Sequence, residues 1–253
     1  MIEDGALEDP APSAIYGAHF YPDWPAGTIA LRAGASFSGN DAFTLTIRGV
    51  ESHSAVPSAG IDAIVVGAHV ITALQSFAAR ELDIEEAASL TVDTISGGRV
   101  SNLLAAEVVM TGTVRISSEI IRDTLREKIE RVIRGVCDSF GAEYELEYKL
   151  RNLPPLVCTP AEVEVLRDAA GEVLGGGGVI EMRHPRLAAD TIHHWFAHMP
   201  GAFFMVGTAS SDPATRFPSH HQRFNIAPET WEAVVAAEAM TAIRYLEKAG
   251  EVS

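Results

Sequence analysis

Residues 41–63, DAFTLTIRGVESHSAVPSAGIDA, decide the fold of this chain. Apolar residues alternate with polar ones at its start, at Phe43, Leu45 and Ile47. This period of two predicts a strand with one buried face. The following loop carries His53, and Asp62 then fits the N-cap of a helix whose apolar residues keep helical spacing to about Leu82.

This module extends to about Val157, and the same alternation and helical spacing recur within it. They predict strands over Leu90–Thr94, Glu107–Ile116 and Glu143–Lys149, and a long helix between Ser118 and Gly141. The order βαββαβ is that of a ferredoxin-like sheet with both helices on one face. An outer strand of such a sheet is an unpaired edge, and pairing it with a second copy would form a dimer.

The flanking segments resemble two halves of one α/β domain. We expect short strands at 14–20, 28–32, 179–182 and 202–207, and helices at 160–174, 186–198 and 228–247. The predicted organisation is therefore 1–40 as the first, incomplete part of one domain, 41–157 as an inserted domain, and 158–253 as the second part. Met1–Gly5 reads either as a frayed terminus or as the end of a helix that starts upstream.

Composition excludes several classes of protein. The 253 residues carry a net charge of −15, and the pI is near 4.9. This charge argues against a nucleic-acid partner, which needs clustered Lys and Arg. Cys137 and Cys158 form no disulfide framework, and the longest apolar run, 63–74, is shorter than the about 20 residues of a membrane span. We expect a cytoplasmic protein with no membrane partner.

Candidate chemistry concentrates in the histidines of the last third, at positions 184, 193, 194, 198, 220 and 221. A catalytic zinc needs three protein ligands and an open position. His194 and His198 could share a helix face, but the glutamate of a His-Glu-x-x-His motif is missing. The chain has no Gly-x-Ser-x-Gly elbow, and no Lys-Ser/Thr pair follows Gly175–Gly178. The residues alone thus indicate a candidate metal site without a complete catalytic set.

Several motifs together resemble the zinc-dependent amidohydrolase and metallopeptidase family of hippurate hydrolase, auxin-conjugate hydrolases, aminoacylase and carboxypeptidase G. They fall in the family's order and are Gly17-x-His19-x-x-Pro22, Gly49-x-x-x-His53-x-Ala55-x-Pro57, Gly97-Gly98 to Asn102, Gly112-Thr113-Val114-Arg115, Pro200-Gly201-Ala202-Phe203-Phe204, and His220 with Phe224. The resemblance implies a partial zinc-peptidase α/β catalytic domain with an inserted ferredoxin-like dimerisation or lid domain.

The resemblance also implies roles for single residues. His19 and His220 match two ligands of a divalent metal, which would be zinc, with manganese and cobalt as alternatives. His53 matches the lid histidine that reaches the active site of the partner subunit and stabilises the oxyanion. This role is physically reasonable, since a hydrogen-bond donor aimed at developing charge acts in the transition state. Asn102 and Arg115 match substrate-holding positions, and a guanidinium suits a carboxylate.

The departures from the family pattern limit the functional expectation. The family's Cys-x-His ligand pair and Glu-Glu pair lie upstream of anything in this chain, and Ala189-Asp190-Thr191-Ile192 stands where relatives have Gly-Glu-Asp-Phe. Two histidines leave a metal under-coordinated, and no general base remains. We expect a homodimeric piece of an amidohydrolase for N-acyl amino acids that is inactive alone. The alternative is a non-catalytic dimerisation or binding protein.

Overall fold

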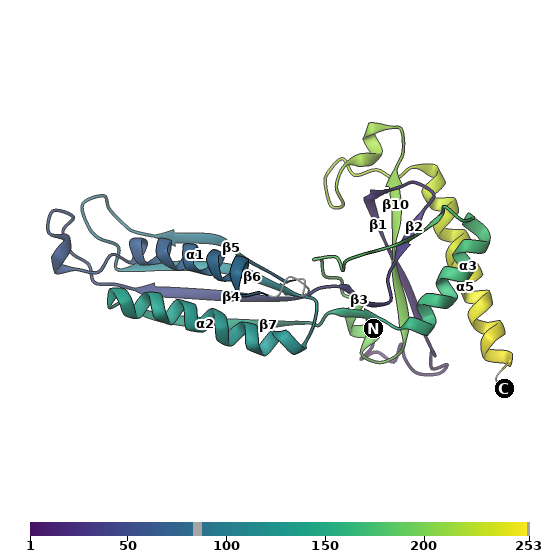
Figure 1. Cartoon of the computed structure of the whole chain (residues 1–253), viewed down its shortest axis with the longest axis horizontal. Helices are drawn as coiled ribbons and strands as arrows, with labels where there is room; N and C mark the ends of the chain where they lie inside the picture. Colours follow the sequence, from purple (N-terminus) through teal and green to yellow (C-terminus); the bar gives the residue numbers. More distant parts are fainter. Residues whose placement is uncertain (83–87, 252–253) are drawn as a thin grey trace. The chain divides into compact units, whose positions relative to one another are not determined.

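The computed structural model describes residues 1–82 and 88–251 and divides the chain into two compact units (Figure 1). Phe37–Pro155 and Arg186–Asp190 form one, here called the inserted unit. Met1–Ser36, Leu156–Pro185 and Thr191–Ser253 form the other, here called the flanking unit.

The inserted unit is a four-stranded antiparallel sheet with two helices. In chain order its elements are β4 (Gly39–Arg48), the 3₁₀ turn η1 (Pro57–Ala59), α1 (Ala63–Arg80), β5 (Ala88–Gly97), β6 (Glu107–Ile116), α2 (Ile120–Phe140) and β7 (Glu143–Leu153). The strand order is β5-β6-β4-β7, and both helices pack on one face of the sheet (Figure 1). The predicted βαββαβ arrangement is confirmed.

Local chemistry explains why these elements begin and end where they do. The Asp62 carboxylate accepts a hydrogen bond of 2.9 Å from the backbone N–H of Ile64, so it caps α1 as predicted. Gly141 ends α2 in the left-handed conformation, with φ of 70°, which glycine adopts at little cost. The alternating side chains of β4 that the sequence assigned to the core are buried: Phe43, Leu45 and Ile47.

Helix α1 is long and apolar enough, by length and composition, to cross a membrane. In the structure its apolar residues Val66, Val70, Leu74 and Phe77 pack into the core of the inserted unit. A core helix passes the same test of composition, so this feature alone is weak evidence of a span.

A buried ion pair joins three elements of the inserted unit. The Arg122 guanidinium on α2 donates to the fully buried Asp41 carboxylate on β4 at 2.9 Å and to the Leu153 carbonyl on β7 at 3.1 Å. The Tyr148 hydroxyl also donates to Asp41, at 3.4 Å. Burial, together with the Asp41 charge, raises the pKa of Tyr148 well above its usual value. These contacts fix β4, β7 and α2 to one another.

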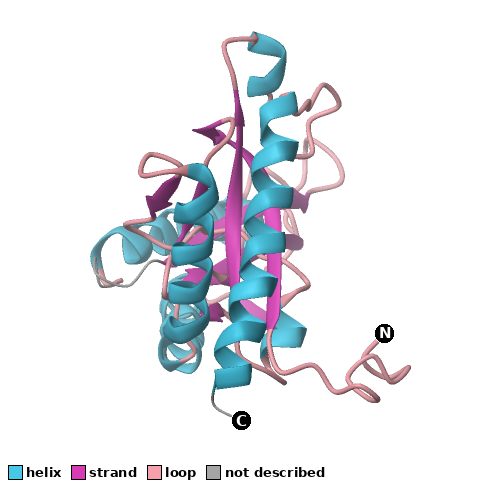
Figure 2. Ribbon diagram, turned by 90° about the vertical axis from the view of Figure 1, so that its right-hand side faces the viewer, coloured by secondary structure: helices cyan, strands magenta, loops and turns pink. Residues whose placement is uncertain are grey.

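The flanking unit is a mixed four-stranded sheet in the order β1-β10-β2-β9. The strands are β1 (Ile15–Pro25), β2 (Ile29–Leu31), β9 (Val179–Glu181) and β10 (Gly201–Ala209). Helices α3 (Pro160–Leu174) and α5 (Pro228–Glu251) pack side by side (Figure 2). The short elements are β3 (Gly34–Phe37), β8 (Leu156–Cys158), α4 (His193–Phe196) and η2 (Pro213–Arg216), and β3 pairs with β8.

The expected helix over 186–198 was wrong, because only His193–Phe196 is helical. The backbone of Arg186 instead bridges Phe37, and the Arg186 carbonyl accepts from the Ser38 N–H at 2.9 Å. The Ala188 carbonyl accepts from the Ser38 hydroxyl at 3.0 Å. These extended pairings attach Arg186–Asp190 to the inserted unit, although the sequence assigned them to the segment 158–253.

Candidate functional site

The flanking unit brings two of the predicted site residues together. His19 lies on β1, and His220 lies in the turn after η2. Their imidazole rings have centroids 5.6 Å apart. His19 and His220 are far apart in the sequence but close in space. Strand β1 pairs in parallel with β10, and the chain that follows β10 returns to β1, where Ser219 bonds to Phe20.

The hydrogen bond of His19 defines which ring nitrogen is free. Its Nδ1 lies 3.1 Å from the carbonyl oxygen of Phe20, which can only accept. The Nδ1 atom therefore carries the hydrogen, and Nε2 keeps its lone pair in the neutral ring. Histidines that bind metals commonly donate the other N–H to a backbone carbonyl in this way.

The pair fits part of a metal site. A tetrahedral ion about 2.0–2.1 Å from each nitrogen would place two imidazole centroids about 5 Å apart, close to the observed spacing. Within residues 1–82 and 88–251, no group of three or more His, Cys, Asp or Glu side chains is placed to hold a metal. The described part of the chain thus offers two imidazole ligands and no third.

The other histidines of the last third do not join this pair. His193 is buried on α4, and His198 lies beyond the end of that four-residue helix. The helix face that would have presented His194 and His198 together therefore does not form. His221 stacks on Phe217, with ring centroids 4.8 Å apart.

In the inserted unit, the structure brings His53 and Asn102 together. The backbone N–H of Ser54 donates to the Asn102 carbonyl at 3.0 Å, and His53 forms a β-bridge with Leu103. The backbone N–H of Ala55 donates to His53 Nδ1 at 3.0 Å. Because Nδ1 is the acceptor, the neutral ring carries its hydrogen on Nε2. The exposed His53 is thereby set up as a hydrogen-bond donor.

Arg115 lies at the opposite end of the same sheet. It is opposite Asn40 on β4 and Ser89 on β5, whereas the His53 loop leaves β4 at Arg48 and the Asn102 loop enters β6 at Glu107, the residue opposite Arg48. Eight residues of antiparallel strand span about 27 Å. The structure therefore separates Arg115 from His53 and Asn102.

Arg115 and its cross-strand neighbour Asn40 each have a buried polar atom without a hydrogen-bond partner among the described residues. These atoms are Nη1 of Arg115 and Oδ1 of Asn40. A buried donor or acceptor without a partner is unfavourable, so such a group often marks a place where a ligand binds. Sequence reasoning missed Asn40, because its position opposite Arg115 depends on the register of β4 against β6.

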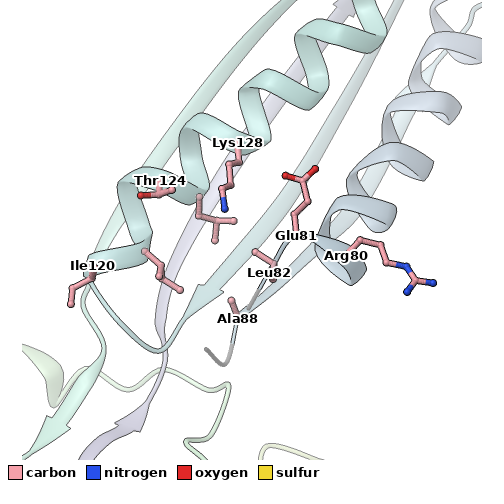
Figure 3. Close-up of a pocket in the computed structure, with 9 residues that line it drawn as sticks. Arg80, Glu81, Leu82, Ala88, Ile120, Thr124 and Lys128 are labelled. Carbon is pink, nitrogen blue, oxygen red and sulfur yellow. The ribbon is translucent and has the colours of Figure 1, made fainter. Parts of the chain in front are cut away.

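A pocket of the inserted unit lies away from all of these residues. It opens between the end of α1 and the first turns of α2 (Figure 3). Arg80, Glu81 and Lys128 line it together with apolar side chains, and it contains no histidine. Leu82 and Ala88, the described residues on either side of positions 83–87, also line it.

Comparison with known proteins identifies the inserted domain and its relatives. Residues 36–139 match the model of the peptidase dimerisation domain of the M20 type. The chain is 31% identical over 245 residues to the Bacillus subtilis protein named "Putative amidohydrolase YhaA", covering 97% of this chain and 61% of that protein. It is 30% identical over 226 residues to the N-acetyl-L-cysteine deacetylase of Bacillus subtilis, covering 89% of this chain and 52% of the relative.

A solved structure shows the same fold. The Bacillus subtilis YXEP protein, described as a dinuclear metal binding peptidase from the M20 family, superposes with a TM-score of 0.72 at 24% identity. The match covers 97% of this chain and 60% of that structure. The chain thus spans about 60% of the length of YhaA and of the YXEP protein, and 52% of the deacetylase.

Proposed function

We propose that this chain, which carries a peptidase dimerisation domain of the M20 type and is 31% identical to a protein named as an amidohydrolase, forms part of a divalent-metal-dependent hydrolase of N-acyl amino acids. The observation that carries the proposal is the His19–His220 pair, whose rings lie 5.6 Å apart, with the Nε2 of His19 left free. Imidazole suits zinc, and manganese and cobalt are the alternatives. A bound divalent ion supplies Lewis acidity, which polarises the carbonyl of the substrate.

His53 is proposed as the catalytic donor. Its Nδ1 accepts from the Ala55 N–H, so its exposed Nε2–H can donate to an oxygen that gains negative charge. A donor held in place before the reaction stabilises such an oxyanion without reorganisation. Asn102, held beside His53 by the Ser54–Asn102 backbone bond, is proposed as a substrate contact.

Arg115 is proposed to bind the carboxylate of the amino acid. Its Nη1 is buried and has no partner in the described residues, so a carboxylate would satisfy it. The likeness to an N-acetyl-L-cysteine deacetylase supports an N-acyl amino acid as the class of substrate.

We further propose that the inserted unit forms a homodimer through β5. The other edge strand, β7, alternates charges at Glu143, Glu145, Glu147 and Lys149, which discourages edge pairing. Strand β5 has a single charged residue, and exposed apolar side chains lie on it and beside it: Ile64, Val65, Ile95 and Val100. An open edge next to apolar surface suits pairing with a second copy.

The described residues also favour a second candidate function. They contain no third metal ligand beside His19 and His220, and Asp190 lies in the short segment that pairs with the inserted unit. A chain that keeps the dimerisation module without the chemistry would be a non-catalytic dimerisation or binding protein. Under the main proposal, the 253-residue chain alone is inactive until further ligands and a base are supplied.

Zinc binding and hydrolysis separate these proposals. Equilibrium dialysis of the purified chain against zinc should show binding that is lost in the His19→Ala/His220→Ala double variant. Binding that is equal in both proteins would refute the metal site and favour the second candidate. Hydrolysis of hippurate or N-acetyl amino acids by the chain alone, abolished by a chelator, would refute the proposal that it is inactive by itself.

A further inference from the structure

One backbone carbonyl joins the two histidines of the candidate metal pair. The Phe20 oxygen accepts from His19 Nδ1 at 3.1 Å and from the Ser219 hydroxyl at 2.7 Å. Ser219 directly precedes His220 and is 199 residues from Phe20 along the chain. A carbonyl oxygen has two lone pairs, so it can accept both hydrogen bonds at once.

The backbone at His220 needs such support. Its φ of 67° lies in the left-handed region, which is uncommon for residues other than glycine. Residues held in this conformation persist where the surrounding structure fixes them, and they cluster at functional sites. His220 is itself exposed, so packing of its ring does not hold it in place.

The turn around His220 is braced on its other side by different contacts. The His221 N–H donates to the Pro218 carbonyl at 3.0 Å, and the Phe224 N–H donates to the His221 carbonyl at 2.8 Å. The His221 ring stacks on Phe217, and the Arg223 guanidinium lies 4.2 Å from the centroid of the Phe217 ring. These contacts hold the turn together within itself, whereas the Ser219 hydroxyl ties it to β1.

We propose that Ser219 is a positioning residue for the metal pair: through the Phe20 carbonyl it holds His220 at ligand distance from His19. The same carbonyl keeps the hydrogen of His19 on Nδ1 and so leaves Nε2 free for the metal. The inference rests on the proposed function, because it gives Ser219 a role only if the two histidines bind a divalent ion. The cation that the two histidines would bind is zinc or a similar divalent ion, because imidazole nitrogen is a common ligand of zinc.

The test compares three variants of the full chain. Ser219→Ala removes the hydroxyl, Ser219→Thr keeps it, and Ser211→Ala changes an exposed serine between β10 and η2. Zinc affinity is measured by competition with a chromophoric chelator. Loss of a group that orients a metal ligand typically lowers affinity about tenfold or more. We expect this loss in Ser219→Ala, with affinity at the wild-type level in Ser219→Thr and Ser211→Ala.

A second readout without metal keeps the two proposals apart. Amide hydrogen exchange of 217–224 in the zinc-free chain should be faster in Ser219→Ala and unchanged in Ser219→Thr. If zinc binding is the same in the wild type and in His19→Ala/His220→Ala, the proposed metal pair fails, and the positioning role fails with it. If the wild type binds zinc through the pair, but Ser219→Ala changes neither zinc affinity nor exchange, only the role of Ser219 is overturned.

Discussion

In the inserted unit, β4 has hydrogen-bonded strands on both sides, whereas in the flanking unit the site-bearing strand β1 lies at the edge of its sheet. Strand β10, the neighbour of β1, is buried from Gly201 to Thr208. Strand β1 is only half-buried from Ile15 to Pro22, although Ile15, Tyr16, Ala18 and Phe20 would suit an interior strand. A long apolar strand at an open edge is unusual, because natural sheets protect their edges.

The comparison shows where each unit gets its stability. The inserted unit closes a core between its sheet and α1 and α2, and the Asp41–Arg122 pair ties that core together. The flanking unit carries His19 of the histidine pair on an edge strand, β1. We therefore expect the inserted unit to be the more stable of the two. All three tryptophans lie in the flanking unit, so their fluorescence reports on that unit alone.

The largest effect is expected from breaking the buried ion pair. Asp41→Ala should lower the free energy of unfolding of the inserted unit by about 4 kcal/mol, because it removes the buried carboxylate to which both Arg122 and Tyr148 donate and leaves Arg122 the exposed Glu119 as its charged partner. Urea unfolding followed by circular dichroism should show the loss, while tryptophan fluorescence keeps its midpoint. The control is Arg48→Ala on the same strand, whose exposed pair with Glu145 contributes under about 1 kcal/mol. Equal losses in the two variants would contradict the expectation.

A cavity in the core should have the next largest effect. Ile129→Ala removes a fully buried side chain of α2 and should cost about 3 kcal/mol. Ile120→Ala on the same helix changes a side chain that is 87% exposed and should cost less than about 0.5 kcal/mol. The same urea experiment measures both. If Ile129→Ala also shifted the tryptophan transition, the two units would not unfold independently.

A smaller effect is expected at the proposed dimer edge. Ile95→Lys places a charge on β5, where Ile95 is 51% exposed, and should weaken the dimer about tenfold, or about 1.4 kcal/mol. Glu147→Lys on β7 should leave association unchanged. Sedimentation velocity over a range of concentrations measures both variants. Weaker association in the β7 variant alone would assign the interface to the other edge.

The smallest effect concerns the two buried thiols, one in each unit. Burial raises the pKa of Cys137 to about 11 and also raises that of Cys158, so both are protonated, unreactive thiols at pH 8. Labelling then requires local opening, and because β1 is an open edge we expect Cys158 to react several-fold faster than Cys137. A disulfide reagent at pH 8 on Cys137→Ala and Cys158→Ala, which leave one thiol each, measures the two rates. Faster labelling of Cys137 would reverse the comparison.

The sequence predicted features that depend on local spacing. The βαββαβ order followed from apolar periods of two and of 3.6 residues, and Asp62 was placed as an N-cap because its role depends on its immediate neighbours. Features that depend on pairing across the chain were not predictable. The stretch 186–198 lost its expected helix to backbone pairing with Phe37 and Ser38.

The same limit applies to the candidate site. Resemblance named His19 and His220, but the shared Phe20 carbonyl and the left-handed turn at His220 depend on how the loop after η2 returns to β1. Asn40 became visible only through its register with Arg115. A serine or an asparagine beside a predicted residue carries no distinctive pattern in sequence.

The separation of Arg115 from His53 has a genetic consequence. Arg115 lies on β6 and His53 lies in the loop beyond the opposite end of the same sheet, so about 27 Å of strand separates the two positions, more than a small N-acyl amino acid can span. A centre that used both groups would therefore have to take them from different copies of the chain. In an enzyme that also has the further metal ligands and the base, two alleles, one defective at His53 and one at Arg115, would then complement each other in mixed dimers, although each is inactive when it is the only copy in the cell.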